Sequence, residues 1–392
     1  MTFHLNTSGF MAAIGLSRRW INRRNICQRI HQGIQWLPVF RILAALSVIA
    51  GAAACHAASP EIRLTGNTMG TTYAITVVNT GNIDAAALQK KIDQRLAALN
   101  KSMSTFDPDS ELSRFNAIRS TTESVTPSAD FLHVLQVAAH LYQLTDGAWD
   151  GTLDPLITLW GFGRAGGIQK PPDETRIRQA LLHVGFDRIV LDDAGRLSKK
   201  DPAVTLDLAS IAKGYGVDAI SRLLGDDGIE HFIVEIGGEI YARGVRPDGT
   251  AWRVGINRPD KTADAREIYA VVHLADQAMA TSGDYRIFFQ IGDHAYAHVL
   301  DPRTGKPVEN GVVSVSVVAA NCTVADGLAT ALMVMGPEKG IALVDTLPGV
   351  SCLIITREPD GTLKNHPSAR FVMQLVSPGH LPQKTAWGEG EN

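Results

Sequence analysis

One pair of residues that could do chemistry is a carboxylate and a hydroxyl that lie four positions apart. Asp326 and Thr330 lie in the stretch ADGLAT, and helical spacing would place both oxygens on one face. Such oxygens are hard ligands that suit Mg²⁺ or Ca²⁺. Taken alone, the pair is more typical of the N-terminal capping pattern of an ordinary helix.

A lysine near an expected strand-to-helix junction is a second candidate. In DLASIAKGYGVD (207–218), Asp207 ends an apolar run that predicts a strand, and Lys213 falls in the first turn of the helix expected next. Free backbone amides and the positive end of a helix suit a phosphate, and the lysine adds a point charge. The spacing is not that of a Walker loop, and an exposed lysine beside a capping aspartate fits equally well.

A histidine at the end of an expected strand is a third candidate. His298 opens the stretch HVLDPRTG, whose DPRTG portion predicts a turn. Imidazole titrates near neutral pH and can act as a general base, although a lone histidine is more often structural.

Three other stretches join Gly, Ser or Thr to Met or an aromatic residue, which could enclose a planar ring such as adenine or isoalloxazine. They are Met69–Tyr73, Met103–Pro108 and Gly147–Asp150.

The charge of the chain is divided unevenly along its length. Residues 1–54 hold six arginines and no acid, while the whole chain of 392 residues holds 37 basic and 40 acidic residues. The rest therefore carries a net charge of −9, which disfavours nucleic acid as a partner. A hydrophobic content of 45% excludes a disordered chain.

The first 54 residues have the pattern of an export signal. The apolar run 42–54 follows the arginines and is too short to span a bilayer as a helix. Small residues before Cys55 predict lipidation of that cysteine. A twin-arginine signal at 17–20 and a buried helix of the fold are the alternatives. We expect a linker over 55–61, one domain over 62–378 and a disordered tail over 379–392.

The hydrophobic periodicity predicts an α+β (mixed α/β) fold. Helices are expected over 82–103, 128–144, 210–224 and 325–335, with a loop over 160–175. Gly237-Gly238 predicts a hairpin, and Cys322 and Cys352 could pair in an oxidising compartment. Strands are expected over 71–78, 231–236, 239–245, 252–256, 268–274, 286–291, 295–300, 312–320, 351–356 and 369–376.

Taken together, eight motifs in this order resemble the ApbE family of FAD:protein FMN transferases. The resemblance covers about residues 62–375 and implies largely antiparallel sheets flanked by helices, an architecture related to the T-fold. Family members are commonly periplasmic lipoproteins, so it also implies a lipid anchor on the periplasmic face of a bacterial membrane, with the inner membrane favoured. The motifs are Met69–Tyr73, Met103–Asn116, Asp146–Gly163, Asp207–Asp218, Ile236–Glu239, Thr281–Arg286, His298–Gly305 and Ala325–Thr330.

The resemblance implies a reaction and a set of roles. FAD would be cleaved at its pyrophosphate, FMN would be joined through its phosphate to a Thr or Ser hydroxyl of a target protein, and AMP would leave. Mg²⁺ would be bound by Asp326, Thr330 and the backbone carbonyl of Ser210. His298 would take the proton of the acceptor hydroxyl, oriented by Asp301. The FAD-binding residues would be Met69, Phe106, Ala148, Trp149, Asp150, Asp207, Lys213 and Val299.

Two other activities fit the same motifs. One is a Mg²⁺-dependent FAD pyrophosphatase that releases FMN and AMP, and the other is a non-catalytic FAD-binding lipoprotein. For a transferase, the resemblance implies acceptors such as flavin-carrying subunits of sodium-translocating NADH:quinone reductase or of Rnf-type complexes.

Overall fold

A single large antiparallel sheet is the centre of the computed structural model. Residues 61–79, 81, 83–162, 170–260, 267–283, 288–291 and 294–376 are described, with backbone alone at 288–291 and 294–297. The predicted signal over 1–54, Cys55, the linker up to residue 60 and the tail 379–392 lie outside them. In spatial order the strands are β1 (Glu61–Thr68), β2 (Thr71–Val78), β5 (Phe232–Ile236), β6 (Glu239–Arg243), β9 (Gln277–Gly283), β14 (Val312–Ala319), β15 (Ser351–Arg357) and β16 (Leu363–Pro367).

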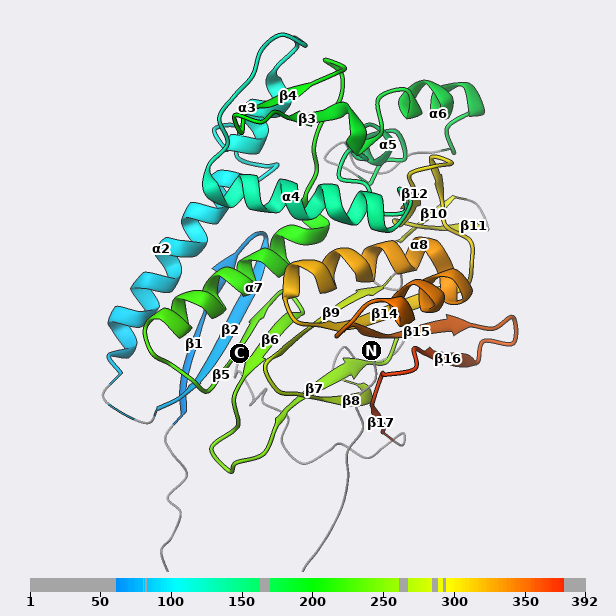
Figure 1. Ribbon diagram of the computed structural model, residues 1–392. Helices are drawn as coiled ribbons and strands as arrows, with labels where there is room; N and C mark the ends of the chain where they lie inside the picture. The colour runs from blue at the N-terminus through cyan, green and yellow to red at the C-terminus, as the bar shows by residue number, and fades with distance from the viewer. Residues whose placement is uncertain are drawn as a thin grey trace, which may run out of the picture. The chain divides into compact units, whose positions relative to one another are not determined.

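Helices cover one face of this sheet (Figure 1). The helices α2 (Ala85–Met103), α7 (Ala209–Asp226) and α8 (Cys322–Thr346) lie against the strands, and α4 (Ala129–Leu144) packs on the outer side of these helices. Their apolar sides and the facing side chains of the strands form the main core, in which Ile75, Val234 and Val317 are fully buried. Burial of this apolar surface is the main force that holds helices and sheet together. By length and hydropathy α8 could span a membrane, but 56% of its most apolar window is buried inside the protein.

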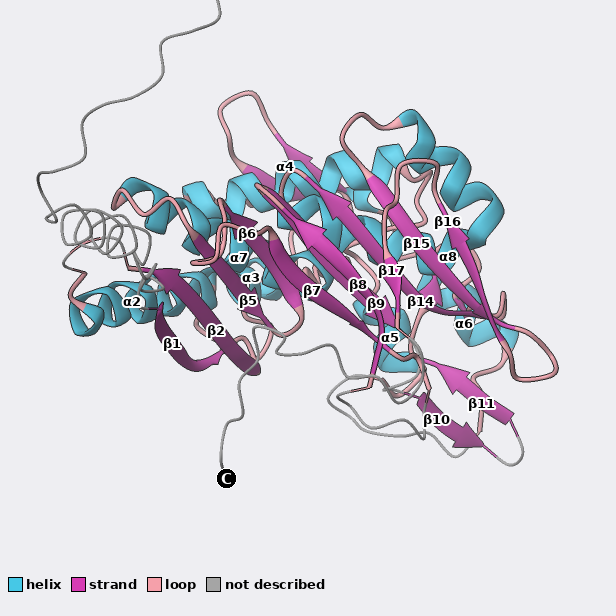
Figure 2. Ribbon diagram, turned by 90° about the horizontal axis from the view of Figure 1, so that it is seen from below, coloured by secondary structure: helices cyan, strands magenta, loops and turns pink. Residues whose placement is uncertain are grey.

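A smaller sheet packs on the opposite face, as Figure 2 shows. It consists of β7 (Trp252–Asn257), β8 (Ile268–Leu274) and β17 (Gln374–Leu375). Trp252, Val254 and Val272 of this sheet meet Ile233 and Leu353 of the large sheet in a second core. The large sheet is therefore buried on both faces, which explains why its central strands are apolar on both sides.

Several shorter elements complete the described part of the fold. Leu156, Trp160 and Ile177 pack with Leu300 in a third, small cluster. The elements are α3 (Glu111–Ala117), α5 (Asp154–Leu159), α6 (Glu174–Leu181), the 3₁₀ helix η1 (Phe186–Arg188) and the strand pairs β3 (Ile189–Leu191) with β4 (Leu197–Lys199), β10 (Phe288–Ile291) with β11 (His294–Ala297), and β12 (Leu300–Asp301) with β13 (Lys306–Pro307).

The α+β class and most of the predicted elements are confirmed. Ile236 pairs with Glu239, so Gly237-Gly238 is the two-residue turn of a β-hairpin, with φ of 63° and 106°. The predicted strand over 369–376 is wrong, because β16 ends at Pro367 and β17 begins only at Gln374, in another sheet. The helix predicted over 325–335 is longer, and Gly336, with a φ of 75°, interrupts it. Cys322 and Cys352 are both free thiols in the core.

Two details of the strand-to-helix junction also differ from prediction. Residues 203–208 form no strand, and Asp207 instead bonds through its amide to the carbonyl of Gly151 at 2.8 Å. The helix α7 begins at Ala209, which places Lys213 in its second turn rather than its first. The lysine is therefore carried by regular helix, and its backbone position is fixed by the packing of α7.

Gly214 allows α7 and α8 to approach closely. A Cβ at this position would lie 2.5 Å from the carbonyl oxygen of Cys322 and 2.9 Å from Cβ of Asp326. Both distances are shorter than any normal contact of a Cβ atom, and one of the two neighbours is backbone that cannot rotate away. Only glycine fits this crossing without displacing one of the helices.

We expect Gly214→Ala to lower the free energy of unfolding by about 1–3 kcal/mol, because the added methyl overpacks the helix crossing. Urea denaturation checks this, with Gly81→Ala as the control because a Cβ there meets nothing within 4 Å. Equal stability of the two variants would show that the crossing tolerates a side chain.

Candidate active site

The helices α7 and α8 bring a buried carboxylate against the backbone of α7. Asp326 is 3% exposed, and the amide of Gly214 donates to its Oδ2 at 3.0 Å. The cap of α8 is Asn321, whose side chain accepts from the amide of Val324. Asp326 therefore lies inside the helix, and the capping alternative for this residue is wrong.

A second buried carboxylate holds Lys213. Nζ of Lys213 lies 2.7 Å from Oε2 of Glu239, the first residue of β6, which is 3% exposed. The hairpin turn lies against this lysine, since a Cβ at Gly237 would be 3.1 Å from its Cδ. Lys213 is thus an ion-paired residue rather than a free surface lysine. Sequence reasoning gave Glu239 no role, although it ends the IGGE motif.

Burial and mutual charge shift the pKa of all three groups. Burial raises the pKa of Asp326, and Lys213 opposes this shift. Burial also raises the pKa of Glu239, to about 8, and Asp326 adds to the effect. Burial alone would lower the pKa of Lys213, but the charges of Asp326 and Glu239 raise it overall. With both carboxylates ionised the cluster is one positive charge short, so it suits a cation.

Hydroxyl groups extend the site along α8. Thr330 lies one helical turn after Asp326, and its Oγ1 is 3.3 Å from Oγ of Ser282 in β9. Thr281, the residue before Ser282 in β9, shares a hydrogen bond with Ser316 of β14 at 2.8 Å. Ser282 was not singled out by sequence reasoning, and its place in the Thr281–Arg286 motif was the available signal. Arg286 itself lies outside the described residues.

Ser210 lies where α7 begins and is fixed by a buried tryptophan. Nε1 of Trp149 donates to Oγ of Ser210 at 3.0 Å, and Trp149 is 1% exposed. In a regular helix the amide of Gly214 donates to the carbonyl of Ser210. Here the same amide donates to the carboxylate of Asp326 as well, so it is shared between two acceptors. This carbonyl therefore retains capacity to accept a further bond or to ligate a cation.

The donor set at this site fits Mg²⁺. One buried carboxylate, one hydroxyl and one backbone carbonyl are hard oxygen ligands, and Mg²⁺ usually keeps several waters as well. Among the described residues no three His, Cys, Asp or Glu side chains cluster in a way that could hold a metal. The ion would thus rely on Asp326 for charge and on uncharged oxygens for the remaining positions.

The residues predicted to line the flavin lie in contrasting environments. Met69 is half-buried in the β1–β2 turn with a φ of 49°, beside Gly216 of α7. Phe106 is 79% exposed, while Ala148 and Trp149 are 1% exposed. Phe106 therefore presents an aromatic face to solvent, whereas Trp149 supports Ser210 from within the core. Contact of any of them with FAD stays a prediction.

The remaining candidates lie in or just before the β12–β13 pair, except Asp207 at the start of α7. Both carboxylate oxygens of Asp301 accept from the Arg303 guanidinium, at 2.8 and 2.9 Å. Asp301 is thus engaged within its own turn, and its role in orienting His298 stays a prediction. His298 and Val299 are half-buried and follow β11 directly. Oδ1 of Asp207 accepts from the amide of Ala209 at 2.8 Å, at the start of α7.

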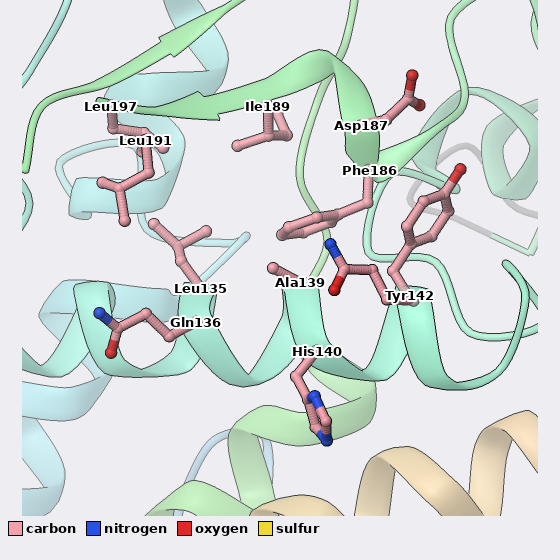
Figure 3. Close-up of a pocket in the computed structure, with 11 residues that line it drawn as sticks. Leu135, Gln136, Ala139, His140, Tyr142, Phe186, Asp187, Ile189, Leu191 and Leu197 are labelled. Atoms are coloured by element: carbon pink, nitrogen blue, oxygen red, sulfur yellow. The ribbon is translucent and has the colours of Figure 1, made fainter. Parts of the chain in front are cut away.

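Two neighbouring cavities share Tyr142 and Gln143 of α4 in their lining. One, of about 250 Å³, lies between the turn that carries Pro302 and Arg303 and the motif residues Asp146 and Asp150, so the structure brings two of the motifs together. The other, of about 420 Å³, lies between α4 and the β3–β4 pair (Figure 3). It is lined mainly by apolar side chains and includes none of the cation-binding candidates.

Asp150 gives a pH-dependent prediction. Burial raises its pKa to about 6, from 3.8. Between these values the unfolded chain releases the proton and the folded protein retains it, so the free energy of unfolding falls as pH rises. Asp150→Asn removes this effect. Between pH 4 and pH 7 we expect the free energy of unfolding of the unmodified protein to fall by on the order of 1–3 kcal/mol relative to that of the variant.

Urea denaturation at the two pH values checks this. Exposed Asp226→Asn is the control and should show no such change. The same difference between Asp150→Asn and the unmodified protein at both pH values would contradict the expectation.

Comparison with known proteins agrees with the motif order. The chain matches the ApbE family over residues 69–354. It is 40% identical over 330 residues to the FAD:protein FMN transferase of Vibrio cholerae (84% of this chain, 96% of that protein) and 37% identical over 332 residues to that of Haemophilus influenzae (83% and 95%). The solved structure of flavin transferase ApbE from Vibrio cholerae superimposes with a TM-score of 0.72 at 41% identity, covering 79% of this chain and 97% of that one. The chain belongs to the ApbE family.

Proposed function

We propose that this protein is an FAD:protein FMN transferase. Its relatives of that name match it over more than four fifths of its length. The observation that carries the proposal is the juxtaposition of Asp326, Lys213 and Glu239, with Thr330 one turn along α8. Phosphoryl transfer from a pyrophosphate requires positive charge beside the phosphates and fixed positions for the reacting oxygens.

The carboxylate of Asp326, the hydroxyl of Thr330 and the carbonyl of Ser210 would hold Mg²⁺. When bound, the ion supplies Lewis-acid stabilisation of charge on the phosphate oxygens. Trp149 keeps Ser210 in place through its indole N–H. Gly214 places its amide on one oxygen of Asp326, which fixes the orientation of the carboxylate.

Lys213 would bind a phosphate oxygen of FAD through its ammonium group. Glu239 holds Nζ in position at 2.7 Å, and the glycine turn before it leaves room for the lysine stem. Because the charges of Asp326 and Glu239 raise the pKa of Lys213, the lysine keeps its proton at neutral pH and acts as a cation rather than as a base.

The chemical step joins an acceptor oxygen to the FMN phosphorus. The hydroxyl oxygen of a Thr or Ser in the target protein forms the new P–O bond, and the bond to the AMP oxygen breaks. An imidazole nitrogen of His298 would take the hydroxyl proton, and AMP would leave with the electron pair. The stretch HVLDPRTG, which His298 opens and which is one of the eight motifs of the family resemblance, supports this assignment.

We also propose export and anchoring. The leader pattern over 1–54 and the small residues before Cys55 support a lipoprotein on the periplasmic face of the membrane. Acceptors there would be exported flavoprotein domains, such as subunits of sodium-translocating NADH:quinone reductase or Rnf-type complexes.

Replacement of Cys55 by Ser should release the protein from the membrane fraction, and full retention would contradict lipidation.

We expect Asp326→Ala to reduce transfer by at least about 10³-fold, because the site loses its buried carboxylate. Asp226→Asn, which removes a charge on the exposed end of α7, is the control and should keep full activity. The assay follows AMP release and in-gel flavin fluorescence of an acceptor, with and without a chelator. Full activity of Asp326→Ala, or activity that resists the chelator, would refute the cation site.

The ratio of AMP to flavinylated acceptor separates the transferase from the pyrophosphatase. A transferase releases one AMP for each acceptor that is modified and little AMP when the acceptor is absent. A pyrophosphatase releases AMP and free FMN at the same rate without any acceptor. A non-catalytic FAD-binding protein would release neither product, so one measurement distinguishes all three activities.

A further inference from the structure

An open cavity of about 380 Å³ lies where α4, α7, α8 and the strands β5 and β6 meet. Asp218, Ser221 and Arg222 line it from α7, where spacing of three and four residues puts them on one side of the helix. Tyr241 and Arg243, two apart in β6, line it from the sheet. In Figure 1, α4 lies beside both α7 and α8.

The charge on the cavity wall is mostly positive. Within the described residues, no carboxylate forms an ion pair with the guanidinium of Arg222 or Arg243. Asp218 is the acidic residue of the wall, and the first turn of α8 occupies its carboxylate. It accepts from the amides of Cys322 and Thr323 at 2.7 and 2.8 Å, and from the Thr323 hydroxyl at 2.5 Å. Neither guanidinium thus has a carboxylate at ion-pair distance, although the charges of Asp130 and Asp218 act on Arg222 from further away.

A buried hydroxyl at the same wall also lacks a partner. Ser221 is 8% exposed, and its Oγ forms no hydrogen bond within the described part of the chain. Buried polar atoms are almost always bonded in native proteins, because an unmet hydrogen bond destabilises the fold. Rotation about χ1 is the single motion that this hydroxyl needs to meet a group in the cavity.

We propose that this cavity binds a phosphate-type anion, held by Arg222 and Arg243. Planar guanidinium groups bind phosphate oxygens in a bidentate manner. Ser221 lies eight positions after Lys213 in α7, which is roughly 12 Å along the helix, so this site is distinct from the catalytic one. The apolar and aromatic part of the lining also leaves room for more than the anion itself, as in a nucleoside monophosphate. The inference is independent of the proposed transferase activity.

Calorimetric titration of the full-length chain in detergent tests the proposal. Orthophosphate, AMP and adenosine are titrated in turn at constant ionic strength, with a chelator present to suppress binding at the catalytic site. We expect phosphate and AMP to bind and adenosine not to bind. A tighter Kd for AMP than for phosphate identifies a nucleotide as the better ligand, and equal values identify the free anion.

Variants assign the binding to this cavity. We expect the Arg222→Gln/Arg243→Gln double variant to bind at least about tenfold more weakly. Arg246→Gln is the matched control, because it removes the same charge three residues further on, where Arg246 pairs with Asp248 at 3.5 Å. Lys213→Met, once circular dichroism shows that it folds, should bind as the unmodified protein does, because Lys213 does not line this cavity.

Three results would overturn the proposal. They are no binding of phosphate or AMP by the unmodified chain, equal binding by the double variant, and loss of binding in Lys213→Met alone. Should the double variant fail to fold, as judged by circular dichroism, Arg222→Lys/Arg243→Lys and Ser221→Ala take its place. The lysine double variant keeps the charge, and Ser221→Ala keeps the shape of the wall. Unchanged affinity in both would also count against the site.

Discussion

The structure depends on a carboxylate buried at the crossing of two helices. Asp326 has almost no contact with water, and a buried charge is costly unless opposite charge and hydrogen-bond donors stand beside it. Gly214 supplies a backbone donor, and Lys213 supplies the charge. Because the lysine is shared with Glu239, the cluster is short of positive charge when both carboxylates are ionised. This imbalance is what makes the site suited to a divalent cation and to the phosphates that such a cation binds.

The fold can be understood as the support of that cluster. The two cores fix the large sheet between helices and a small sheet, so the ends of its central strands have little freedom. Glu239 begins β6, Ser282 lies near the end of β9, and the antiparallel pairing of β6 with β9 brings both to one end of the sheet. The helices α7 and α8 then carry Lys213 and Asp326 over that end. A shift of either helix would separate groups whose spacing the chemistry needs.

Local pattern in the sequence predicted what is local in the structure. The helical spacing of Asp326 and Thr330, the Gly237-Gly238 turn and the amphipathic helices are all set within a few residues, and all are confirmed. What depends on contacts between distant segments was missed, such as the pairing of Lys213 with Glu239 and the support of Ser210 by Trp149. The strand predicted over 369–376 failed for the same reason, since partners in different sheets decide where β16 and β17 begin and end.

Relaxation of the ³¹P signals of FAD by Mn²⁺ shows whether a cation held by Asp326 lies beside the pyrophosphate. Mn²⁺ accepts the same hard oxygen ligands as Mg²⁺, and its unpaired electrons broaden the signals of nearby nuclei. With Mn²⁺ bound to the protein, we expect strong broadening of both pyrophosphate signals, and in Asp326→Asn no broadening beyond that caused by free Mn²⁺. Sharp phosphorus signals in the presence of protein-bound Mn²⁺, or equal broadening in that variant, would contradict a cation held by Asp326 beside the phosphates.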